Sequence, residues 1–211
     1  PMLDLRAPAL TDYQRMIKRG FDLFFSILLL PLSLIIMGII ALLIRLEGPG
    51  PILFRQKRVG ENGRLFEMYK FRTMVANAEE MRHLVEKTDL NGQLIHKNPD
   101  DPRVTRIGRI LRRTSMDELP QLFNVLRGDM SWIGPRPELP YLVERYEPWQ
   151  RKRLAVPPGI TGWWQVNGRS EKPMHLYTKD DLYYVENYSL LLDLQILIKT
   201  IGVVLRGKGA F

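Results

Sequence analysis

The longest apolar stretch of the chain lies near its beginning. Residues 21–44 read FDLFFSILLLPLSLIIMGIIALLI and contain a single charged side chain, Asp22. A straight helix of this length would extend about 36 Å, enough to cross the roughly 30 Å hydrocarbon core of a bilayer. The stretch is too long for a secretory signal peptide, and no small-residue cleavage site follows it. The pattern therefore predicts a membrane helix.

Two features of this stretch favour a different path through the membrane. Pro31 lies in its middle, where it removes a backbone donor and clashes one turn back, and Ser33 is placed to satisfy a freed carbonyl. Basic residues flank both ends, which the positive-inside rule assigns to the cytoplasmic face. These residues leave two arrangements open, a straight span or a re-entrant hairpin broken at Pro31 and Ser33. The flanking basic residues are Arg15, Lys18, Arg19, Arg45, Arg55, Lys57 and Arg58.

The rest of the chain has the pattern of an α+β, mostly helical globule. Two short alternating segments around residues 60–63, Gly-Glu-Asn-Gly, predict a β-hairpin with a loop of several residues. Apolar positions recur at helical spacing over 75–88 and 139–156, with a polar loop at 90–102. Two more helices are expected at 181–189 and 190–206. The second is apolar on most of its circumference, so it either lies at a membrane interface or under the hairpin, or is a buried core helix.

Composition narrows the class of protein. A chain of 211 residues with 45% apolar content can bury one good core, and the absence of cysteine excludes disulfides and thiolate metal sites. The net charge of +8 favours an anionic partner, namely nucleic acid, phospholipid headgroups or a phosphorylated substrate, with plain solubility as the alternative. The chain begins with Pro1, which leaves open that it is a processed form or part of a longer protein.

Two adjacent acids, Asp117 and Glu118, stand just before Pro120. Proline is tolerated in the first turn of a helix, so a helix is expected to begin near 116–118 and to end at Gly128. One interpretation is structural. Ser115 and Glu118 fit the S-x-x-E capping box, and acids complement the positive end of the helix dipole.

The residues before the acids suggest a second interpretation. Arginines recur at intervals of three and would form a strip along a helix that leads to the acids. Such a strip is either a solvated face or a phosphate site, and a carboxylate among phosphate-binding groups can hold Mg²⁺ or attack phosphorus. The arginines are Arg103, Arg106, Arg109, Arg112 and Arg113.

Several motifs taken together resemble one family. They are KRGFDL, GPGPILFRQKRVGENG, YKFRTM, DPRVTRIGRILRRTSMDELPQLFNVLRGDMSWIGPRPE, PGITGWWQVNGR and DLYYVENYSLLLDLQILIKT, in order from Lys18 to about Thr200. The chain is similar to the bacterial sugar transferases, the monotopic polyprenyl-phosphate phosphoglycosyl transferases of the undecaprenyl-phosphate sugar phosphotransferase type.

The resemblance implies a Mg²⁺-dependent, two-step phosphoryl transfer from a UDP-sugar to polyprenyl (undecaprenyl) phosphate. Asp117 would attack the phosphorus that bears the sugar and release UMP, and polyprenyl phosphate would then take the phosphosugar from Asp117. Glu118 would hold Mg²⁺, with Asp117 as a second candidate ligand. Lys70 and Arg112 match family positions expected to bind phosphates. Arg136 has a proline on both sides, which pre-sets its backbone, so it is assigned to nucleotide or phosphate binding. Asp181 matches a family acid that assists the metal or orders the site, unless it is simply a helix-start acid.

The resemblance also implies an arrangement at the membrane. It favours the re-entrant hairpin, although relatives break the helix four residues later than Pro31. The expected organisation is an amphipathic lead-in over 1–20, a re-entrant membrane hairpin over 21–46, and a cytoplasmic catalytic globule over 47–211 with a short β-hairpin and interfacial amphipathic helices. The protein would lie on the cytoplasmic face of the bacterial inner membrane, in contact with lipid and not with nucleic acid, and a homodimer is left open.

Two rival hypotheses remain at this point. The chain could be a non-catalytic, basic, membrane-anchored binding module, or an enzyme that binds both substrates in a ternary complex without a covalent step. The sugar cannot be read from the sequence, and hexose 1-phosphate, either glucose or galactose, is the expectation from the larger members of the family.

Overall fold

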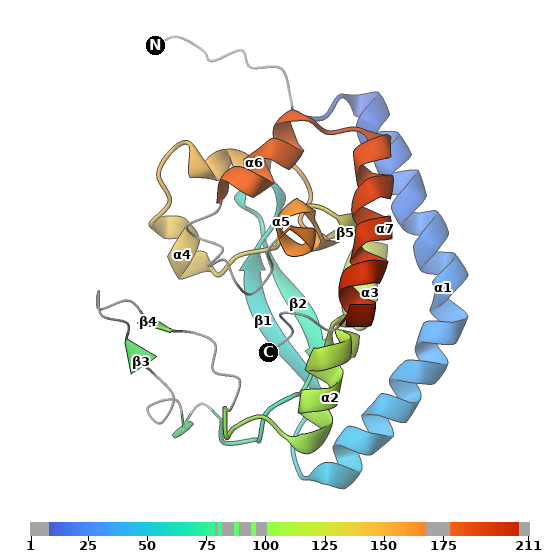
Figure 1. Ribbon diagram of the computed structural model, residues 1–211, viewed down its shortest axis with the longest axis vertical. Coiled ribbons are helices and arrows are strands. Elements are labelled where there is room, and N and C mark those ends of the chain that lie inside the picture. The colour runs from blue at the N-terminus through green and yellow to red at the C-terminus, as the bar shows by residue number, and fades with distance from the viewer. Residues whose placement is uncertain are drawn as a thin grey trace.

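The chain folds as a mostly helical α+β domain, as the sequence predicts (Figure 1). The computed structural model describes residues 9–78, 80–81, 101–167 and 178–206, and the backbone of residues 87–88 and 94–95. The α-helices are α1 (Asp12–Glu47), α2 (Arg106–Thr114), α3 (Gln121–Arg127), α4 (Pro140–Glu144), α5 (Trp163–Val166), α6 (Thr178–Glu186) and α7 (Leu190–Arg206). The 3₁₀ turns are η1 (Glu61–Gly63), η3 (Met116–Glu118) and η4 (Gln150–Ala155). The strands are β1 (Leu53–Val59), β2 (Leu65–Phe71), β3 (Lys87–Thr88), β4 (Leu94–Ile95), β5 (Ser131–Ile133) and β6 (Gly159–Thr161).

Helix α1 is the longest element and lies along one side of the domain. It begins at a capping box in which Thr11 and Gln14 exchange hydrogen bonds, and it runs for 36 residues. The expected break at Pro31 and Ser33 is wrong, because the helix continues through both residues. Instead α1 bends near its middle, with its convex side away from the domain (Figure 1). A proline inside a helix is an established cause of such a bend, since it removes one hydrogen bond and pushes on the preceding turn. In length and composition α1 is able to cross a membrane.

The two faces of α1 differ in burial. The inner face contacts the domain at both ends of the helix, whereas residues 27–32 in between are exposed or half-buried. The outer face is exposed and mostly apolar. The buried residues are Lys18, Asp22, Ser26, Ser33, Met37, Ile40 and Ile44. The exposed residues include Phe24, Ile27, Leu28, Leu32, Ile35, Ile39, Leu42 and Leu46.

Polar contacts attach the first half of α1 to the domain. Lys18 forms a buried ion pair with Asp193 of α7, with 2.8 Å between Nζ and Oδ2. The hydroxyl of Tyr184 in α6 donates to the other oxygen of Asp193 at 2.7 Å. One turn further along α1, Asp22 accepts hydrogen bonds from the Ser131 hydroxyl and the Trp132 amide, each at 2.9 Å. Buried charges are stable only when they are paired and hydrogen-bonded, so these contacts fix the rotation of α1 against the domain.

The second half of α1 is attached by apolar packing and by contacts at its end. Met37, Ile40 and Ile44 form a core cluster with Phe71 of β2 and Leu111 of α2. Hydrogen bonds close the end of the helix as well. Arg72 donates to the carbonyls of Ile44, Gly48 and Pro49, and Glu47 accepts from the backbone amide of Ile107.

The predicted β-hairpin is confirmed. Strands β1 and β2 pair antiparallel from Leu53↔Phe71 to Val59↔Leu65. The loop between them contains η1, where Asn62 and Gly63 adopt positive φ angles of 53° and 81°. Strands β5 and β6 form a second, parallel pair at the centre of the domain.

Two predicted helices are wrong in part. The helix expected over 139–156 is interrupted, because only α4 and η4 form there. Pro148 explains the interruption, since a proline lacks the amide donor and disfavours helical geometry in the residue before it. Of the helix expected over 75–88, residues 79 and 82–86 lie outside the described residues, and residues 87–88 form β3 instead, paired with β4 inside the expected loop.

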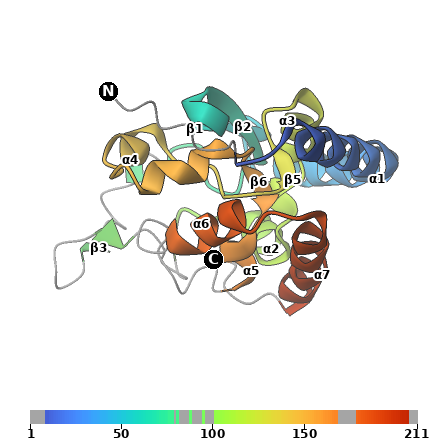
Figure 2. The ribbon, with the colours of Figure 1, turned by 90° about the horizontal axis from the view of Figure 1, so that it is seen from above.

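The two C-terminal helices are confirmed as α6 and α7. Both α1 and α7 lie at the same edge of the domain, and the view from above separates them (Figure 2). Leu192, Asp193 and Ile196 of α7 are buried, whereas Leu191, Leu194 and Ile198 are exposed. Helix α7 is therefore buried on one face only.

We expect the Lys18–Asp193 pair to be required for the attachment of α1. Replacing one partner leaves the other charge buried and unpaired, so Lys18→Met should lower the free energy of unfolding by about 3–5 kcal/mol, and Lys18→Met/Asp193→Leu should recover most of this loss. Lys57 is exposed on β1, and Lys57→Met should change it by less than about 0.5 kcal/mol. Denaturant unfolding in detergent micelles measures all three. Equal stability of Lys18→Met and Lys57→Met would contradict this role.

Candidate functional site

The acid pair lies in a tight turn between two helices. Helix α2 ends at Ser115, which has a left-handed φ of 57°, and Asp117 and Glu118 follow in η3. Helix α3 begins only at Gln121 and ends, as predicted, before Gly128. The predicted capping box is wrong, because the Ser115 side chain makes no cap hydrogen bond and its backbone closes α2 instead. The acids thus project from a short turn held at both ends.

Glu118 is bound by two of the predicted phosphate-binding cations. Lys70 of β2 donates from Nζ at 2.7 Å and Arg136 donates from Nη2 at 3.0 Å. Both cations contact the same oxygen, Oε1, and within the described residues no contact of Oε2 is recorded. Only 13% of the Glu118 side chain is exposed. The cluster therefore leaves one oxygen of a nearly buried carboxylate open to a further ligand.

The pKa values of the two acids are shifted in opposite directions. Burial alone would raise the pKa of Glu118, but Lys70 and Arg136 outweigh it and hold this pKa well below its usual range. Burial raises the pKa of Asp117 above its ordinary value, and the negative charge of Glu118 adds to this, although Lys70 opposes it. Neighbouring carboxyls with pKa values pushed apart are a common sign of divided roles in catalysis.

Arg112 is brought to the site by a close contact between α2 and the chain after β2. A Cβ atom on Gly108 would lie 2.1 Å from the Thr73 carbonyl oxygen, so only glycine permits this approach. One turn later, Arg112 donates from Nε to the Thr73 hydroxyl at 3.0 Å. Burial lowers the pKa of Arg112 and the negative charge of Asp117 opposes this. A guanidinium stays cationic at neutral pH after such a shift.

The predicted arginine strip is only partly present. Arg103 precedes α2 and forms an ion pair with Asp101, with 2.8 Å between Nη2 and Oδ2. Arg106, Arg109 and Arg113 are exposed on α2. Of these arginines only Arg112 therefore belongs to the acid cluster.

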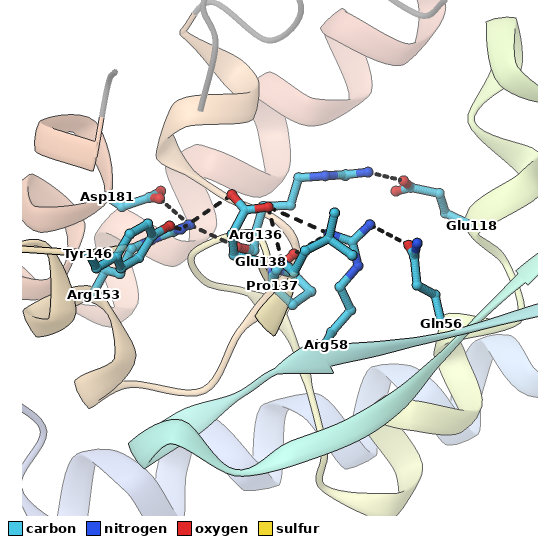
Figure 3. A network of polar contacts seen from close by, with 10 residues as sticks. Gln56, Arg58, Glu118, Arg136, Pro137, Glu138, Tyr146, Arg153 and Asp181 are labelled. Carbon is cyan, nitrogen blue, oxygen red and sulfur yellow. Dashed lines mark hydrogen bonds and ion pairs between the residues drawn. The ribbon is translucent and has the colours of Figure 1, made fainter. Parts of the chain in front are cut away.

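Asp181 lies behind the site rather than in it. It is 1% exposed and pairs with Arg153 of η4, with 2.5 Å between Oδ2 and Nη2. Arg153 also donates to the Tyr146 hydroxyl at 2.6 Å and to the backbone carbonyl of Arg136 at 2.8 Å (Figure 3). Asp181 lies in the first turn of α6, as the helix-start interpretation expects, and its contacts link it through Arg153 to the main chain of Arg136.

The same network extends to the β-hairpin. Glu138 lies between Arg153 and Arg58 of β1, at 3.9 Å and 3.7 Å, and Arg58 donates to the Pro137 carbonyl at 3.2 Å (Figure 3). Burial, with a further contribution from Arg136, lowers the pKa of Arg58 to about 10, which still leaves it charged at neutral pH. Arg153, which is buried, and Arg58, which is half-buried, therefore contact the chain around Arg136 from two directions.

Sequence reasoning missed Arg153, Glu138 and Arg58. Arg153 ends the basic run Arg151-Lys152-Arg153, whose first two residues are exposed and whose third is 1% exposed. Nothing in the spacing of the run distinguishes the buried member. The only signal for Glu138 is its place directly after the rigid Gly-Pro-Arg-Pro segment.

No group of three or more His, Cys, Asp or Glu side chains that could enclose a metal occurs in the described part of the chain. Mg²⁺ does not need such a cage, because it is commonly bound by one or two carboxylates with water and substrate phosphates as the remaining ligands. The adjacent carboxyls of Asp117 and Glu118, with Oε2 of Glu118 open, fit that mode of binding.

Comparison with known proteins agrees with the motifs. Residues 13–207 match the family model described as bacterial sugar transferase. The chain is 43% identical over 199 residues to the galactosyl transferase CpsE of Streptococcus agalactiae, covering 92% of this chain and 43% of that protein. It is 42% identical over 201 residues to the undecaprenyl-phosphate galactose phosphotransferase of Salmonella typhimurium, covering 93% and 42%. It is 39% identical over 202 residues to the exopolysaccharide production protein ExoY of Sinorhizobium fredii, covering 92% and 88%. The chain thus spans less than half of the first two relatives and most of the third.

The opposite pKa shifts predict opposite effects of two similar substitutions. Ionisation of buried Asp117 costs stability above its ordinary pKa of 3.8, so Asp117→Asn should raise the free energy of unfolding at pH 7 by about 1 kcal/mol. Ionised Glu118 stabilises the folded state above its ordinary pKa of 4.5. This stabilisation is lost as the pH falls from 4.5 through the lower pKa that Glu118 has in the folded protein. Glu118→Gln leaves Lys70 and Arg136 unpaired and should cost about 3–5 kcal/mol at pH 7.

Denaturant unfolding at pH 7 and at pH 3 measures both changes. Both differences should shrink at the lower pH, because Asp117 is then protonated in either state and the advantage of an ionised Glu118 declines. Two changes of the same sign at pH 7 would contradict the assignment.

We expect Asp181 to stabilise the domain by neutralising Arg153. Asp181→Asn removes the charge that compensates a buried guanidinium and should cost about 3–5 kcal/mol of unfolding free energy. Glu186→Gln, an exposed change on the same helix, should stay within about 0.5 kcal/mol and serves as the control. Thermal and denaturant unfolding measure both, and equal stabilities would show that the pair contributes nothing.

Proposed function

Because the chain belongs to the bacterial sugar transferase family, we propose that it transfers a sugar 1-phosphate from a UDP-sugar to polyprenyl phosphate and releases UMP. The names of two relatives, an undecaprenyl-phosphate galactose phosphotransferase and a UDP-galactose-lipid carrier transferase, support this reaction class. The observation that carries the proposal is the acid pair enclosed by phosphate-binding cations, in which Glu118 is held ionised by Lys70 and Arg136 while Asp117 beside it carries a raised pKa.

In the first step Asp117 acts as the nucleophile. Its ionised carboxylate forms a bond to the phosphorus that bears the sugar, and the bond from that phosphorus to the bridging oxygen breaks, so UMP leaves with both electrons. A buried carboxylate with a raised pKa is a better nucleophile than a fully solvated one, because fewer water contacts must be lost before it attacks. The short Asp117 side chain has few rotamers, which helps to hold the attacking oxygen in line.

In the second step a phosphate oxygen of polyprenyl phosphate attacks the same phosphorus. The bond to Asp117 breaks, the carboxylate is regenerated, and a polyprenyl-diphosphate sugar is formed. One nucleophile thus serves two transfers in sequence, and the acceptor need not be present during the first.

Charge stabilisation would come from the groups around Asp117. Lys70, Arg112 and Arg136 would bind phosphate oxygens, and Arg is suited to bidentate contacts with them. Glu118, with Oε2 open, would hold Mg²⁺ together with substrate oxygens, and Asp117 is a second candidate ligand. When bound, the ion would neutralise charge on the diphosphate and the leaving group.

We also propose that α1 enters the membrane from one side only. The same domain contacts α1 at Lys18 and at Ile44, which are about 39 Å apart along a helix. A helix that crossed a roughly 30 Å hydrocarbon core could not keep both contacts on one side of it. The outer apolar face and the outward bend fit a shallow insertion with both ends on the cytoplasmic face, where the flanking basic residues are favoured.

The glycan pathway is proposed from the names of relatives. One is an exopolysaccharide production protein and three refer to galactose, so we propose a first membrane step in exopolysaccharide, O-antigen or capsule assembly, with a hexose 1-phosphate as the group transferred. The non-catalytic binding module explains the basic charge and the apolar helix. It gives no reason for the buried acid pair.

Release of UMP from UDP-glucose, UDP-galactose and UDP-N-acetylgalactosamine, with undecaprenyl phosphate and Mg²⁺, tests the proposal. Asp117→Asn should reduce turnover by more than about 1,000-fold because it removes the nucleophile, and Asp12→Asn, an exposed change in α1, should not. Without acceptor, intact mass should show one phosphosugar on the wild-type chain and none on Asp117→Asn. The rate of adduct formation should rise with pH above 3.8, as Asp117 ionises.

A chain that binds undecaprenyl phosphate but releases no UMP from any donor would be a binding module. Turnover without a trapped adduct would favour the ternary-complex mechanism.

A further inference from the structure

A cavity of about 240 Å³ lies directly beside the acid cluster. Glu118 and Arg136 line it together with Ser33, which lies on the inner face of α1 just after the exposed residues 27–32. The cavity therefore connects the proposed reaction site with the part of α1 that bends away from the domain (Figure 1).

The walls of this cavity are mostly apolar. Helix α7 contributes Val203 and Val204, α3 contributes Leu122, and Trp132 and Ile160 come from the central strand pair. Two of the polar groups in the wall satisfy each other, because the hydroxyls of Thr161 and Thr200 are 2.7 Å apart. A cavity with a charged end and apolar walls suits a ligand with an anionic head and an apolar chain.

We propose that this cavity holds the first isoprene units of the acceptor lipid while its phosphate lies at Arg136. The proposal rests on the proposed function, since it assumes that polyprenyl phosphate is the acceptor. The volume lies just below the 300–1,000 Å³ typical of pockets for whole small ligands, so it fits only the beginning of a long chain. The remainder of the chain would leave under the bend of α1, whose outer face is apolar.

The head of the acceptor would reach Asp117 by this route. Arg136 is fixed by Glu118 on its side chain and by Arg153 on its backbone carbonyl, so a phosphate held there would have a defined position beside Glu118, the residue that follows Asp117 in the chain. An apolar anchor behind the phosphate would fix the depth and direction of the acceptor. Such positioning raises the rate of a transfer without any new catalytic group.

The nucleoside of the donor is the competing occupant. Gln165 lines the cavity, its amide nitrogen donates to the Ile160 carbonyl at 3.1 Å, and its Oε1 has no partner among the described residues. A uracil N–H group could donate to this oxygen. The apolar character of the other walls and the contact with α1 favour the lipid chain, and the two half-reactions separate these occupants.

The test fills the cavity from α7 and leaves the site residues unchanged. Val203→Phe places a larger side chain in the cavity, and Ile201→Phe makes a comparable enlargement at a position of the same helix that is 58% exposed. Adduct formation from the UDP-sugar without acceptor reports the first half-reaction. Transfer from the preformed adduct to undecaprenyl phosphate in detergent micelles reports the second.

For Val203→Phe we expect kcat/KM of the second half-reaction for undecaprenyl phosphate to fall about tenfold or more, because several carbons of the first isoprene units can no longer be buried in the cavity. The first half-reaction should stay within about twofold of wild type. Ile201→Phe should leave both unchanged. Val204→Phe, at the neighbouring lining position, repeats the test and should behave like Val203→Phe.

Two results would overturn the inference. Val203→Phe and Val204→Phe that transfer to undecaprenyl phosphate as fast as wild type would show that the chain lies elsewhere. Loss of adduct formation in both variants would assign the cavity to the donor. Failure of the proposed function gives a different result, since the wild-type chain itself would then form no adduct and release no UMP.

Discussion

The attachment of α1 to the domain is the constraint on which the rest of the structure depends. Apolar side chains alone give a helix of 36 residues little preference for one rotation about its axis, because most of its surface is apolar. The buried pair of Lys18 with Asp193, and Asp22 below Ser131 and Trp132, select one face. At the other end Glu47 reaches the first turn of α2, the helix that leads to the acid pair. The outer face of α1 and the acid cluster are thus parts of one rigid arrangement.

Within this frame, two neighbouring carboxyls receive different environments. Glu118 lies between Lys70 and Arg136, whereas Asp117 is half-buried and forms no direct ion pair within the described residues. The difference costs stability at Asp117 and recovers some of it at Glu118. Buried polar clusters of this kind are common where a protein gives up stability for chemistry. Arg153 and Asp181 then act one layer further out, on the backbone of the residue that binds Glu118.

The sequence predicted those features whose cause is local. The hairpin of β1 and β2 follows from alternation and a Gly-Glu-Asn-Gly loop, the end of α3 from Gly128, and α6 and α7 from their apolar spacing. Lys70 and Glu118 were assigned through the resemblance and Arg136 through its two flanking prolines, and the three lie together in the structure. Local rules also failed in a consistent way. The effect of Pro31 was overestimated, because packing at both ends of α1 keeps the helix continuous, and that of Pro148 was overlooked.

What could not be predicted depends on contacts between distant segments. In the sequence Arg153 cannot be distinguished from its exposed neighbours, and only the packing of η4 against α6 shows that it pairs with Asp181. Arg103 likewise cannot be distinguished from Arg112 until the structure shows its ion pair with Asp101. The periodicity of apolar residues and the composition of an element indicate which of its sides is buried. They do not indicate which charged side chains form ion pairs. The role of Asp181 was left open between assisting the metal, ordering the site and starting a helix for the same reason, since its partner is 28 positions earlier in the chain, in a basic run.

The apolar outer face of α1 has a kinetic consequence. With that face in a bilayer, the site would stay at one height above the lipid tails, and the acceptor of the proposed reaction would diffuse in the same plane as the protein. Their encounter would then depend on the number of acceptor molecules per unit of membrane area, and dilution of the surrounding solution would not change it. The proposed donor, a nucleotide sugar, would arrive from solution in three dimensions. Under the proposed function, the supply of the two substrates would therefore be set by two different measures of abundance.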